Sequence, residues 1–446
     1  MIKGKKEMRT QTMNEGKDRA ILVGLQLNDG SSFDHNLEEL ESLCQACDIE
    51  PVFTITQSLD TPHQALYIGS GKVREVKEAA ANLDADLIIF DNALSPSQAR
   101  NLNLEIGLPI LDRTALILEI FQSRARSREA KLQVELARLQ YLLPRLSGMG
   151  TAMSRQGGGS GSRSNKGAGE KKLELDRRHI SHRITECKKE LQAIKKQRET
   201  QRKSRSTSQT PSVALVGYTN AGKSTILNAM LSHYGNDEIT DISHKKVLQE
   251  DMLFATLDTT VRKITIPGKP AFYLSDTVGF IDKLPHHLID AFRSTLEEAI
   301  GADLLLQVVD VSDPYYREHM HVTQDTLNDL GAGDIPMIIA YNKADRLSQF
   351  ADDLPIVTGN HIHMAAGADL GVDALADLIL ANLFGKPVTM ELMIPYSQGS
   401  LVHRISEAGH VKKTEYQNDG TYMQVTFTPS AKDHALIQEV ETYRIE

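Results

Sequence analysis

Apolar runs and amphipathic stretches alternate between residues 19 and 115. Runs typical of strands occur at 20–25, 51–56, 86–90 and 108–111. Between them, the spacing of apolar residues predicts helices over 36–47 and 71–83, and Ser95-Pro96 is typical of a helix start. Strands that alternate with helices favour a parallel sheet. We therefore expect a flexible N-terminus at 1–18 and an N-terminal α/β domain at 19–115.

Residues 116–205 have a helical pattern instead. Two sets of apolar residues recur at steps of three, four or seven, namely Leu132, Leu136, Leu139, Leu143 and Leu146, then Leu173, Ile180, Ile184, Cys187, Leu191 and Ile194. Two amphipathic helices of this kind pair as an antiparallel hairpin, close to a coiled coil. The stretch between them, 147–169, is rich in Gly and Ser and predicts a mobile tip loop.

The last two regions return to mixed patterns. A polar stretch at 204–211 is typical of a linker, and the domain after it, 206–385, contains strand-like runs that each end in a polar motif. Residues 386–446 contain strand-like runs at 388–394 and 422–427 and a helical stretch at 400–408, which predicts a small C-terminal α/β domain. The fold class is therefore α/β and multidomain.

A phosphate-binding loop follows the strand at 213–216. The sequence from Gly217 to Ser224 is Gly-Tyr-Thr-Asn-Ala-Gly-Lys-Ser, and a helical stretch follows it. This is the G-x-x-x-x-G-K-S motif, and the strand before it and the helix after it supply the structural context that confirms such a motif. Glycines let backbone amides approach a polyphosphate, Lys223 reaches the terminal phosphates, and the Ser224 hydroxyl is a candidate Mg²⁺ ligand.

Two further motifs follow strand-like runs. Asp276-Thr277-Val278-Gly279 places a carboxylate where it can hold an Mg²⁺-bound water, with the Gly279 amide facing the γ-phosphate. Asn342-Lys343-Ala344-Asp345 is the pattern that reads guanine, because a carboxylate accepts from groups that adenine does not offer. The three motifs in this order predict a GTPase. Between the first two, the segment Phe254-Ala255-Thr256-Leu257-Asp258-Thr259-Thr260 contains three threonines that compete as the Mg²⁺ ligand that senses the γ-phosphate.

Charge is distributed unevenly along the chain. The net charge is −9, yet residues 122–205 contain 22 Lys or Arg and 8 Asp or Glu, a net of +14, so the rest of the chain carries −23. A basic arm on an acidic body favours a phosphate-rich partner over a solvated, salt-bridged coiled coil. Tyr141 is its single aromatic residue, which favours a folded RNA backbone over stacking on single strands. The candidate RNA contacts are Arg155, Arg163, Lys166, Lys188, Lys189, Lys195 and Lys196.

Composition argues against a disulfide-rich, membrane-spanning or secreted protein. The chain has three cysteines, no apolar run of membrane-spanning length and no signal-peptide pattern, which favours a protein of a reducing cytoplasm. We also expect a monomer. Cys44 and Cys47 form a lone C-x-x-C on the apolar side of a helix and are interpreted as core residues, with zinc or redox chemistry as the alternative. Gly69-Ser70-Gly71-Lys72 is interpreted as a turn into a helix, with a weak phosphate or RNA site as the alternative.

These motifs together resemble the HflX family of bacterial GTPases. The resemblance rests on the phosphate loop, on 254–258, on Asp276 to Phe280, on residues 67–72, on Ser154-Arg155 and on the hairpin, and it covers nearly the whole chain. It implies that Thr256 is the Mg²⁺ threonine. It also implies GTP hydrolysis, binding to ribosomes, chiefly the large subunit and its RNA, and a part in splitting stalled ribosomes after stress. The expected GTP-binding residues are Gly217, Tyr218, Thr219, Asn220, Ala221, Gly222, Lys223, Ser224, Thr225, Phe254, Ala255, Thr256, Leu257, Asp258, Asp276, Thr277, Val278, Gly279, Asn342, Lys343, Ala344, Asp345, Ala365 and Ala366.

Three positions bear on mechanism. Ala365-Ala366 stands where GTPases commonly have Ser-Ala, so a hydroxyl is missing while the Ala366 amide remains for guanine O6. Phe280 stands where many GTPases have a water-orienting glutamine, which predicts slow hydrolysis without a partner. Asn220 is a candidate K⁺ ligand by analogy with related GTPases, and the alternative is that it only shapes the loop.

Two other functions compete with ribosome binding. One is a GTP-dependent switch that binds a protein or membrane partner through the hairpin. The other is an RNA-remodelling NTPase with a second nucleotide activity, ATP included, in the N-terminal domain. The basic arm favours the ribosome.

Overall fold

A computed structural model of the protein describes residues 17–27, 32–146, 165–206, 210–235, 254, 257, 259–283, 288, 296–350, 353–385, 388–427 and 434–445. The chain divides into two units. The first unit comprises residues 1–194 and 282–291, and the second comprises 195–281 and 292–446. Within the described ranges, no helix is both long and apolar enough to cross a membrane.

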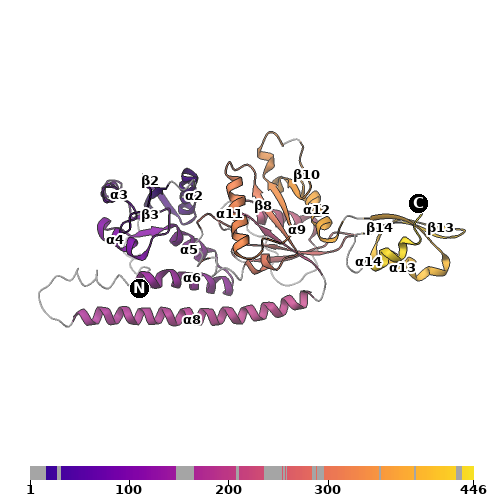
Figure 1. Ribbon diagram of the computed structural model, residues 1–446, viewed down its shortest axis with the longest axis horizontal. Coiled ribbons are helices and arrows are strands. Elements are labelled where there is room, and N and C mark those ends of the chain that lie inside the picture. Colours follow the sequence, from indigo (N-terminus) through magenta and orange to yellow (C-terminus); the bar gives the residue numbers. More distant parts are fainter. Residues whose placement is uncertain are drawn as a thin grey trace. The chain divides into compact units, whose positions relative to one another are not determined.

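The first unit is built on a parallel four-stranded sheet. Its elements are β1 (Asp18–Gln26), α2 (Phe33–Ala46), β2 (Ile49–Ser58), α3 (Ser70–Asn82), β3 (Leu87–Phe90), α4 (Pro96–Ile106), β4 (Ile110–Asp112) and α5 (Arg113–Arg124). The strand order is β2-β1-β3-β4 and every pairing is parallel. Helices α3 and α4 pack on one face, where Val73, Val76 and Leu102 join the strand residues in one core. Helices α2 and α5 lie on the other face (Figure 1). The parallel α/β sheet predicted from the sequence is confirmed.

Helix α5 was not predicted as a separate helix, because its residues from 116 onward were expected to belong to the hairpin. Its residues 114–118, 120 and 121 are all buried, so apolar positions surround the helix and leave no amphipathic period. Residue 116, where the sequence predicts the start of the hairpin, lies inside α5. The first hairpin helix, α6 (Arg128–Leu146), begins only after α5 ends.

The hairpin pairs α6 with the long helix α8 (Asn165–Ser206). Leu132, Leu136 and Cys187 form its core, with Ile184, Leu191 and Ile194 packed against them. Ion pairs join Arg183 to Glu135 and Arg128 to Glu190, so higher numbers on one helix meet lower numbers on the other and the helices are antiparallel. Helix α8 begins within the expected tip loop and extends into the expected linker, whereas residues 147–164 and 207–209 lie outside the described residues.

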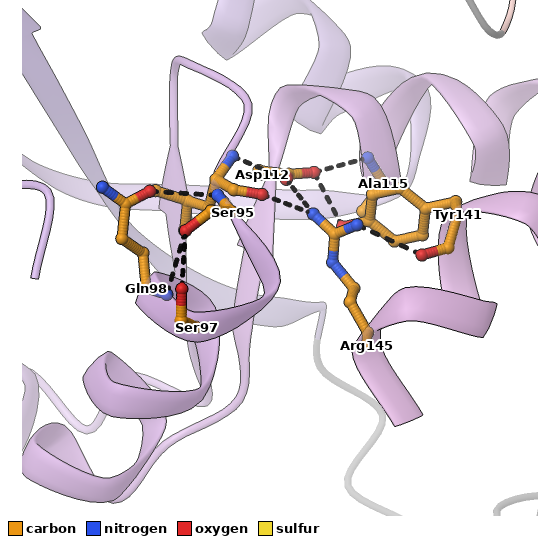
Figure 2. Close-up of polar contacts among 8 residues, drawn as sticks. Ser95, Ser97, Gln98, Asp112, Ala115, Tyr141 and Arg145 are labelled. Carbon is orange, nitrogen blue, oxygen red and sulfur yellow. Dashed lines mark hydrogen bonds and ion pairs between the residues drawn. The ribbon is translucent and has the colours of Figure 1, made fainter. Parts of the chain in front are cut away.

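A buried carboxylate attaches the hairpin to the sheet (Figure 2). Asp112, at the end of β4, is 1% exposed and accepts from the amides of Leu94 and Ala115, at 3.0 Å each. From α6, the Tyr141 hydroxyl donates to it at 2.8 Å and the Arg145 guanidinium at 2.9 Å. Arg145 also donates to the Leu94 carbonyl at 2.7 Å and lies over the Tyr141 ring. The arm's single aromatic residue therefore serves internal packing.

The second unit contains a seven-stranded sheet. Its elements are β5 (Ser212–Val216), α9 (Lys223–Tyr234), β6 (Thr260–Ile264), β7 (Phe272–Asp276), β8 (Leu304–Asp310), α11 (Tyr316–Asp329), β9 (Met337–Asn342), η1 (Ala344–Arg346), β10 (Ile356–Thr358), β11 (His361–His363), η2 (Ala366–Ala368) and α12 (Val372–Phe384). The order is β10-β11-β9-β8-β5-β7-β6, with antiparallel strands only at the two edges. Helices α9 and α12 share one core with the sheet.

The C-terminal elements of the second unit form a small α/β layer. They are β12 (Val388–Ile394), η3 (Tyr396–Gln398), α13 (Gly399–Ala408), β13 (His410–Gln417), β14 (Gly420–Phe427) and α14 (His434–Glu441). The antiparallel sheet has the order β12-β14-β13, and both helices contribute to its core through Leu401, Ile405, Leu436 and Val440. The small C-terminal α/β fold predicted from the sequence is confirmed.

Removal of the Asp112 carboxylate should destabilise the first unit. Asp112→Ala leaves Arg145 and two amides without their acceptor, and we expect a loss of about 3 kcal/mol in the free energy of unfolding. Tyr141→Phe removes one hydrogen bond and should cost about 1 kcal/mol. Urea unfolding measures both, with Glu105→Ala on the exposed side of α4 as the control. A loss for Asp112→Ala no larger than that of the control would contradict this account.

Candidate functional site

The phosphate loop connects β5 to α9 at the centre of the second sheet. Gly217 has φ +140°, and a Cβ there would lie 2.3 Å from the Val308 carbonyl oxygen. Gly222 has φ +97°, and a Cβ there would lie 2.2 Å from Asn342 Nδ2. Both positions therefore require glycine for reasons of space and of backbone conformation. The neighbouring β8 and β9 pack directly against the loop and fix its path.

Lys223 is held over the loop by backbone oxygens. Its side chain is buried, and Nζ donates to the carbonyls of Gly217 at 3.0 Å and Tyr218 at 2.7 Å. Burial lowers the pKa of Lys223 to about 8, while the negative charge of Asp276 acts in the opposite direction. An anionic phosphate placed beside this ammonium favours its charged form, so the site is electrostatically suited to a polyphosphate.

Ser224 and Asp276 bring oxygen ligands together at the end of the loop. The Ser224 hydroxyl donates to Asp276 Oδ2 at 2.7 Å, and Asp276 is fully buried at the end of β7. Magnesium in such sites takes one or two protein oxygens and completes its shell with water and phosphate. The Ser224 and Asp276 oxygens therefore fit Mg²⁺ bound together with a nucleotide. Among the described residues no cluster of three or more His, Cys, Asp or Glu side chains could hold a metal. Ala255, Thr256 and Asp258 lie outside the described residues, and their expected roles stay predictions.

The segment from Asp276 to Phe280 is attached to the phosphate loop by backbone hydrogen bonds. The Thr219 amide donates to the Phe280 carbonyl at 2.8 Å, and the Phe280 amide donates to the Gly217 carbonyl at 3.1 Å. Thr277 is fully buried and its hydroxyl donates to the Leu215 carbonyl at 2.6 Å. The Phe280 side chain is 2% exposed, so it is packed in the protein interior and cannot orient a water molecule.

Asn342 connects the phosphate loop to the expected guanine loop. It is 2% exposed at the end of β9, its Nδ2 donates to the Ala221 carbonyl at 3.0 Å, and its Oδ1 accepts from the Ala366 amide at 3.0 Å. The Ala366 amide, which we expected to face guanine O6, is therefore engaged by Asn342 in this structure. Ala365 and Ala366 are both buried, and Asp345 is exposed on η1, where its carboxylate can meet a base edge.

Lys343 is held by a carboxylate that the sequence analysis did not single out. Its backbone has φ +58°, and its Nζ lies 2.7 Å from Asp310 Oδ2 at the end of β8. The sequence signal that could have identified this carboxylate is the position of Asp310 at the end of β8, the strand beside β9. His319 of α11 was also missed. Its ring stacks on the Tyr218 ring of the phosphate loop with the centroids 3.8 Å apart, a long-range contact that no local pattern shows.

A surface cluster attaches α9 to the guanine loop. His233 Nε2 lies 2.8 Å from Asp369 Oδ1, and Nδ1 lies 3.3 Å from Asp373 Oδ1. Asp369 directly follows η2, which begins with Ala366. The hydrogen bond that the His233 ring donates to the Asp369 carboxylate raises the pKa of His233 more than its other contacts do. Protonated His233 thus strengthens the attachment of this loop.

The expected RNA contacts divide into three groups. Lys188 and Lys189 are exposed on α8 with no partner among the described residues. Lys195 forms an ion pair with Glu297, and Lys196 is also engaged. Arg155 and Arg163 lie outside the described residues, as does the side chain of Lys166.

The two minor motifs of the first unit have structural roles. Burial raises the pKa of both Cys44 and Cys47 to about 12, so neither is a reactive thiolate at neutral pH. Gly69 precedes α3 as its cap residue, and Lys72 pairs with Glu75.

The His233 cluster predicts a pH dependence of stability. A pKa raised in the folded state gives stabilisation that is complete below the ordinary value of about 6.5 and is lost as the pH rises through the folded value. We expect the melting temperature of the protein to exceed that of His233→Gln at pH 6 and the difference to shrink above pH 7. Thermal unfolding from pH 5.5 to 9 measures it. A difference that grows with pH would contradict the assignment.

Comparison with known proteins agrees with this geometry. Family models match the chain at residues 34–122 (GTP-binding GTPase N-terminal), 124–205 (GTP-binding GTPase Middle Region) and 212–343 (50S ribosome-binding GTPase). The GTPase HflX of Lacrimispora saccharolytica is 40% identical over 97% of this chain and 98% of its own. That of Alkalihalophilus pseudofirmus is 44% identical over 86% and 87%, and that of Escherichia coli K12 is 38% identical over 91% and 92%.

Among solved structures, a GTP-binding protein from Sulfolobus solfataricus in complex with GDP is 23% identical and covers 82% of this chain and 98% of its own, with a TM-score of 0.40. A score of this size says little about how the parts of the chain are arranged. The three consecutive family models and the near-complete coverage of relatives about 40% identical are decisive instead. The chain belongs to the HflX family of GTPases, and it binds and hydrolyses GTP.

Proposed function

We propose that this GTPase binds the large ribosomal subunit in the cytoplasm and splits or rescues stalled ribosomes under stress. The observation that carries the proposal is the exposed basic surface of α8, on a GTPase whose nucleotide domain matches the model for 50S ribosome-binding GTPases. A surface that presents lysines without internal partners is suited to RNA phosphates, because binding them releases counterions without breaking contacts of the protein.

The ion pairs of the hairpin define that surface. Arg183 lies between the helices and is occupied by Glu135, Glu186 and Glu190, so it holds the hairpin together. Lys188 and Lys189 are exposed instead. Lys195 binds Glu297 within the second unit, so changing it would also disturb that unit. Lys188 and Lys189 are therefore the cleanest positions for a test of RNA binding.

The residues of the nucleotide site have separable roles. Lys223 and the loop amides bind the phosphates, and Asp345 reads guanine. Ser224 and Asp276 would hold Mg²⁺, with Thr256 as a further proposed ligand, and the ion would neutralise phosphate charge during transfer. Phe280 is buried and leaves the attacking water without a side chain from this position to orient it. Because no side chain at this position orients the water, we expect hydrolysis to be slow in the isolated protein and faster on the ribosome.

Asn220 is placed to supply part of the missing charge through K⁺. Its side chain is exposed and has no partner among the described residues. Its backbone has φ +58°, a conformation that asparagine adopts more readily than most residues, which equally suits a role in loop shape. Glycine also adopts this conformation, so Asn220→Gly removes the amide oxygen and keeps the loop.

Charge reversal on α8 should weaken ribosome binding. In Lys188→Glu/Lys189→Glu, each lost phosphate contact should reduce the slope of log affinity against log salt by about 1, or about 2 in total. Sedimentation with purified large subunits at several salt concentrations measures it, with GTP affinity unchanged. The control is Arg74→Glu/Lys77→Glu, which makes the same charge change on α3. Equal affinity and slope for both double variants would instead favour a protein-binding hairpin.

Potassium should stimulate hydrolysis more than sodium if Asn220 is a ligand. Both Asn220→Ala and Asn220→Gly should then abolish the difference between KCl and NaCl while GTP affinity stays within several-fold. Turnover in matched salts, with and without large subunits, measures it. A normal K⁺ response in Asn220→Gly would show that the residue only shapes the loop. Equal rates in both salts for the unmodified protein would exclude the K⁺ mechanism.

A further inference from the structure

A buried hydroxyl of the phosphate loop has no hydrogen-bond partner. Thr219 is 7% exposed, and its Oγ1 is enclosed by the protein without a donor or acceptor among the described residues. The hydroxyls of Ser224 and Thr277 differ, because each of them donates to a protein oxygen, at 2.7 and 2.6 Å respectively. Thr219 therefore lacks the kind of partner that these neighbouring hydroxyls have.

Packing does not explain this hydroxyl. A buried hydroxyl without a partner has lost its hydrogen bonds to water and gains none in return, which destabilises the folded protein. A valine side chain has a similar shape and would fill the same space without that cost. An unpaired polar group in the interior of a native protein calls for an explanation, and a role in catalysis is one. The Thr219 hydroxyl thus points to a partner that arrives with the nucleotide.

Thr219 lies where the γ-phosphate has to bind. A Cβ built on Gly279 would lie 3.0 Å from Thr219 Cγ2 and 3.0 Å from Lys223 Nζ. The Lys223 ammonium and the Gly279 amide are the two groups that the sequence motifs assign to the terminal phosphate. Oγ1 of Thr219 is attached to the same carbon atom as Cγ2. The unpaired hydroxyl is therefore next to both of these phosphate-binding groups.

The backbone around Thr219 is held by its neighbours. The Thr219 amide donates to the Phe280 carbonyl at 2.8 Å, and the Phe280 amide donates to the Gly217 carbonyl at 3.1 Å. Tyr218, the preceding residue, is 6% exposed, and its ring stacks on that of His319. The fold therefore sets the position of Thr219 before any nucleotide binds, which is the preorganisation that makes a polar group effective in catalysis.

The same hydrogen bonds place Thr219 beside the residue that replaces glutamine. In many GTPases, a glutamine after the glycine of the Asp-x-x-Gly motif orients the attacking water. Phe280 occupies that position in this chain, and its apolar side chain is buried. Because the Thr219 amide binds the Phe280 carbonyl directly, the two residues are adjacent across the site. A hydroxyl at Thr219 can perform part of the task that an apolar ring cannot.

We propose that the Thr219 hydroxyl orients the water that attacks the γ-phosphate. Oγ1 accepts a hydrogen bond from the water and donates its own hydrogen to a γ-phosphate oxygen, so that the water is held beside the phosphorus. A single hydroxyl offers fewer contacts than a glutamine amide, which agrees with slow hydrolysis. The inference rests on the GTPase activity and does not depend on ribosome binding.

The hydroxyl is unchanged at the end of the reaction. The water oxygen forms a bond to the γ-phosphorus while the bond between that phosphorus and the β,γ-bridging oxygen breaks. The electron pair of the broken bond leaves with GDP. One proton of the water passes to a γ-phosphate oxygen, and the products are GDP and inorganic phosphate. Thr219 keeps its own proton, so it acts by orientation and not as a general base.

The test compares Thr219→Val, which keeps the shape of the side chain, with Thr219→Ser, which keeps the hydroxyl. Single-turnover hydrolysis of GTP by the full-length protein, without ribosomes, should slow at least about tenfold in Thr219→Val and stay within about threefold in Thr219→Ser. Affinities for GDP and for a non-hydrolysable GTP analogue should change little in both variants. The ratio of rates in KCl and NaCl should equal that of the unmodified protein, which separates this role from that of Asn220.

A second measurement does not depend on activity. Removal of an unpaired hydroxyl removes a cost, so nucleotide-free Thr219→Val should melt at or above the temperature of the unmodified protein. The control is Thr323→Val on α11. Thr323 is 1% exposed and its hydroxyl donates to the His319 carbonyl at 2.8 Å, so this variant should melt at a lower temperature and hydrolyse GTP at the normal rate.

Three results would overturn the proposal. The first is an unchanged hydrolysis rate in Thr219→Val, whether or not its affinity for the GTP analogue falls. The second is equal slowing in Thr219→Ser, which would assign the effect to the shape of the loop. The third is a melting temperature of Thr219→Val lowered as much as that of Thr323→Val, which would show that the Thr219 hydroxyl already has a structural partner.

Discussion

The nucleotide site depends on one buried amide side chain. Asn342 donates to the phosphate loop through Ala221 and accepts from the guanine loop through Ala366, so a single residue fixes the distance between the two halves of a GTP site. The two loops come from opposite ends of the domain sequence. Because the amide is buried, loss of either bond leaves an unpaired polar group in the interior, and this makes the arrangement rigid.

Both sheets place their chemistry at the same topological position. In the second unit, Asp276, Asp310 and Asn342 end β7, β8 and β9, and they hold Ser224, Lys343 and the phosphate loop. In the first unit, Asp91 directly follows β3 and Asp112 ends β4. Asp112 holds the hairpin, and Asp91 holds the segment that follows the nucleotide site. Carboxylates at strand ends thus serve the nucleotide site in the second unit, whereas in the first unit they hold the hairpin and the segment that follows the nucleotide site.

Sequence patterns were sufficient where the determining interactions are local. The phosphate loop, the strand ends at Asp276 and Asn342, and the heptad-like spacing of the hairpin depend on residues close together in the chain, and their elements are confirmed. Helix α5 was missed because burial on all sides removes the amphipathic period. The Lys283–Asp91 pair joins residues 192 positions apart, and the stack of Tyr218 on His319 spans two elements. No periodicity or motif encodes contacts of that kind.

The return of residues 282–291 to the first unit means that the boundary between the units is crossed three times by the chain. A fragment ending at Ile194 would contain Asp91 but not Lys283, so the buried Asp91 carboxylate would lose the lysine that binds it in the intact protein. A cut after Ile194 therefore separates two residues of the first unit, Asp91 and Lys283, that form an ion pair in the intact protein. Residues 1–194 are consequently not the whole of the first unit, because that unit also includes a segment from the middle of the second unit's sequence.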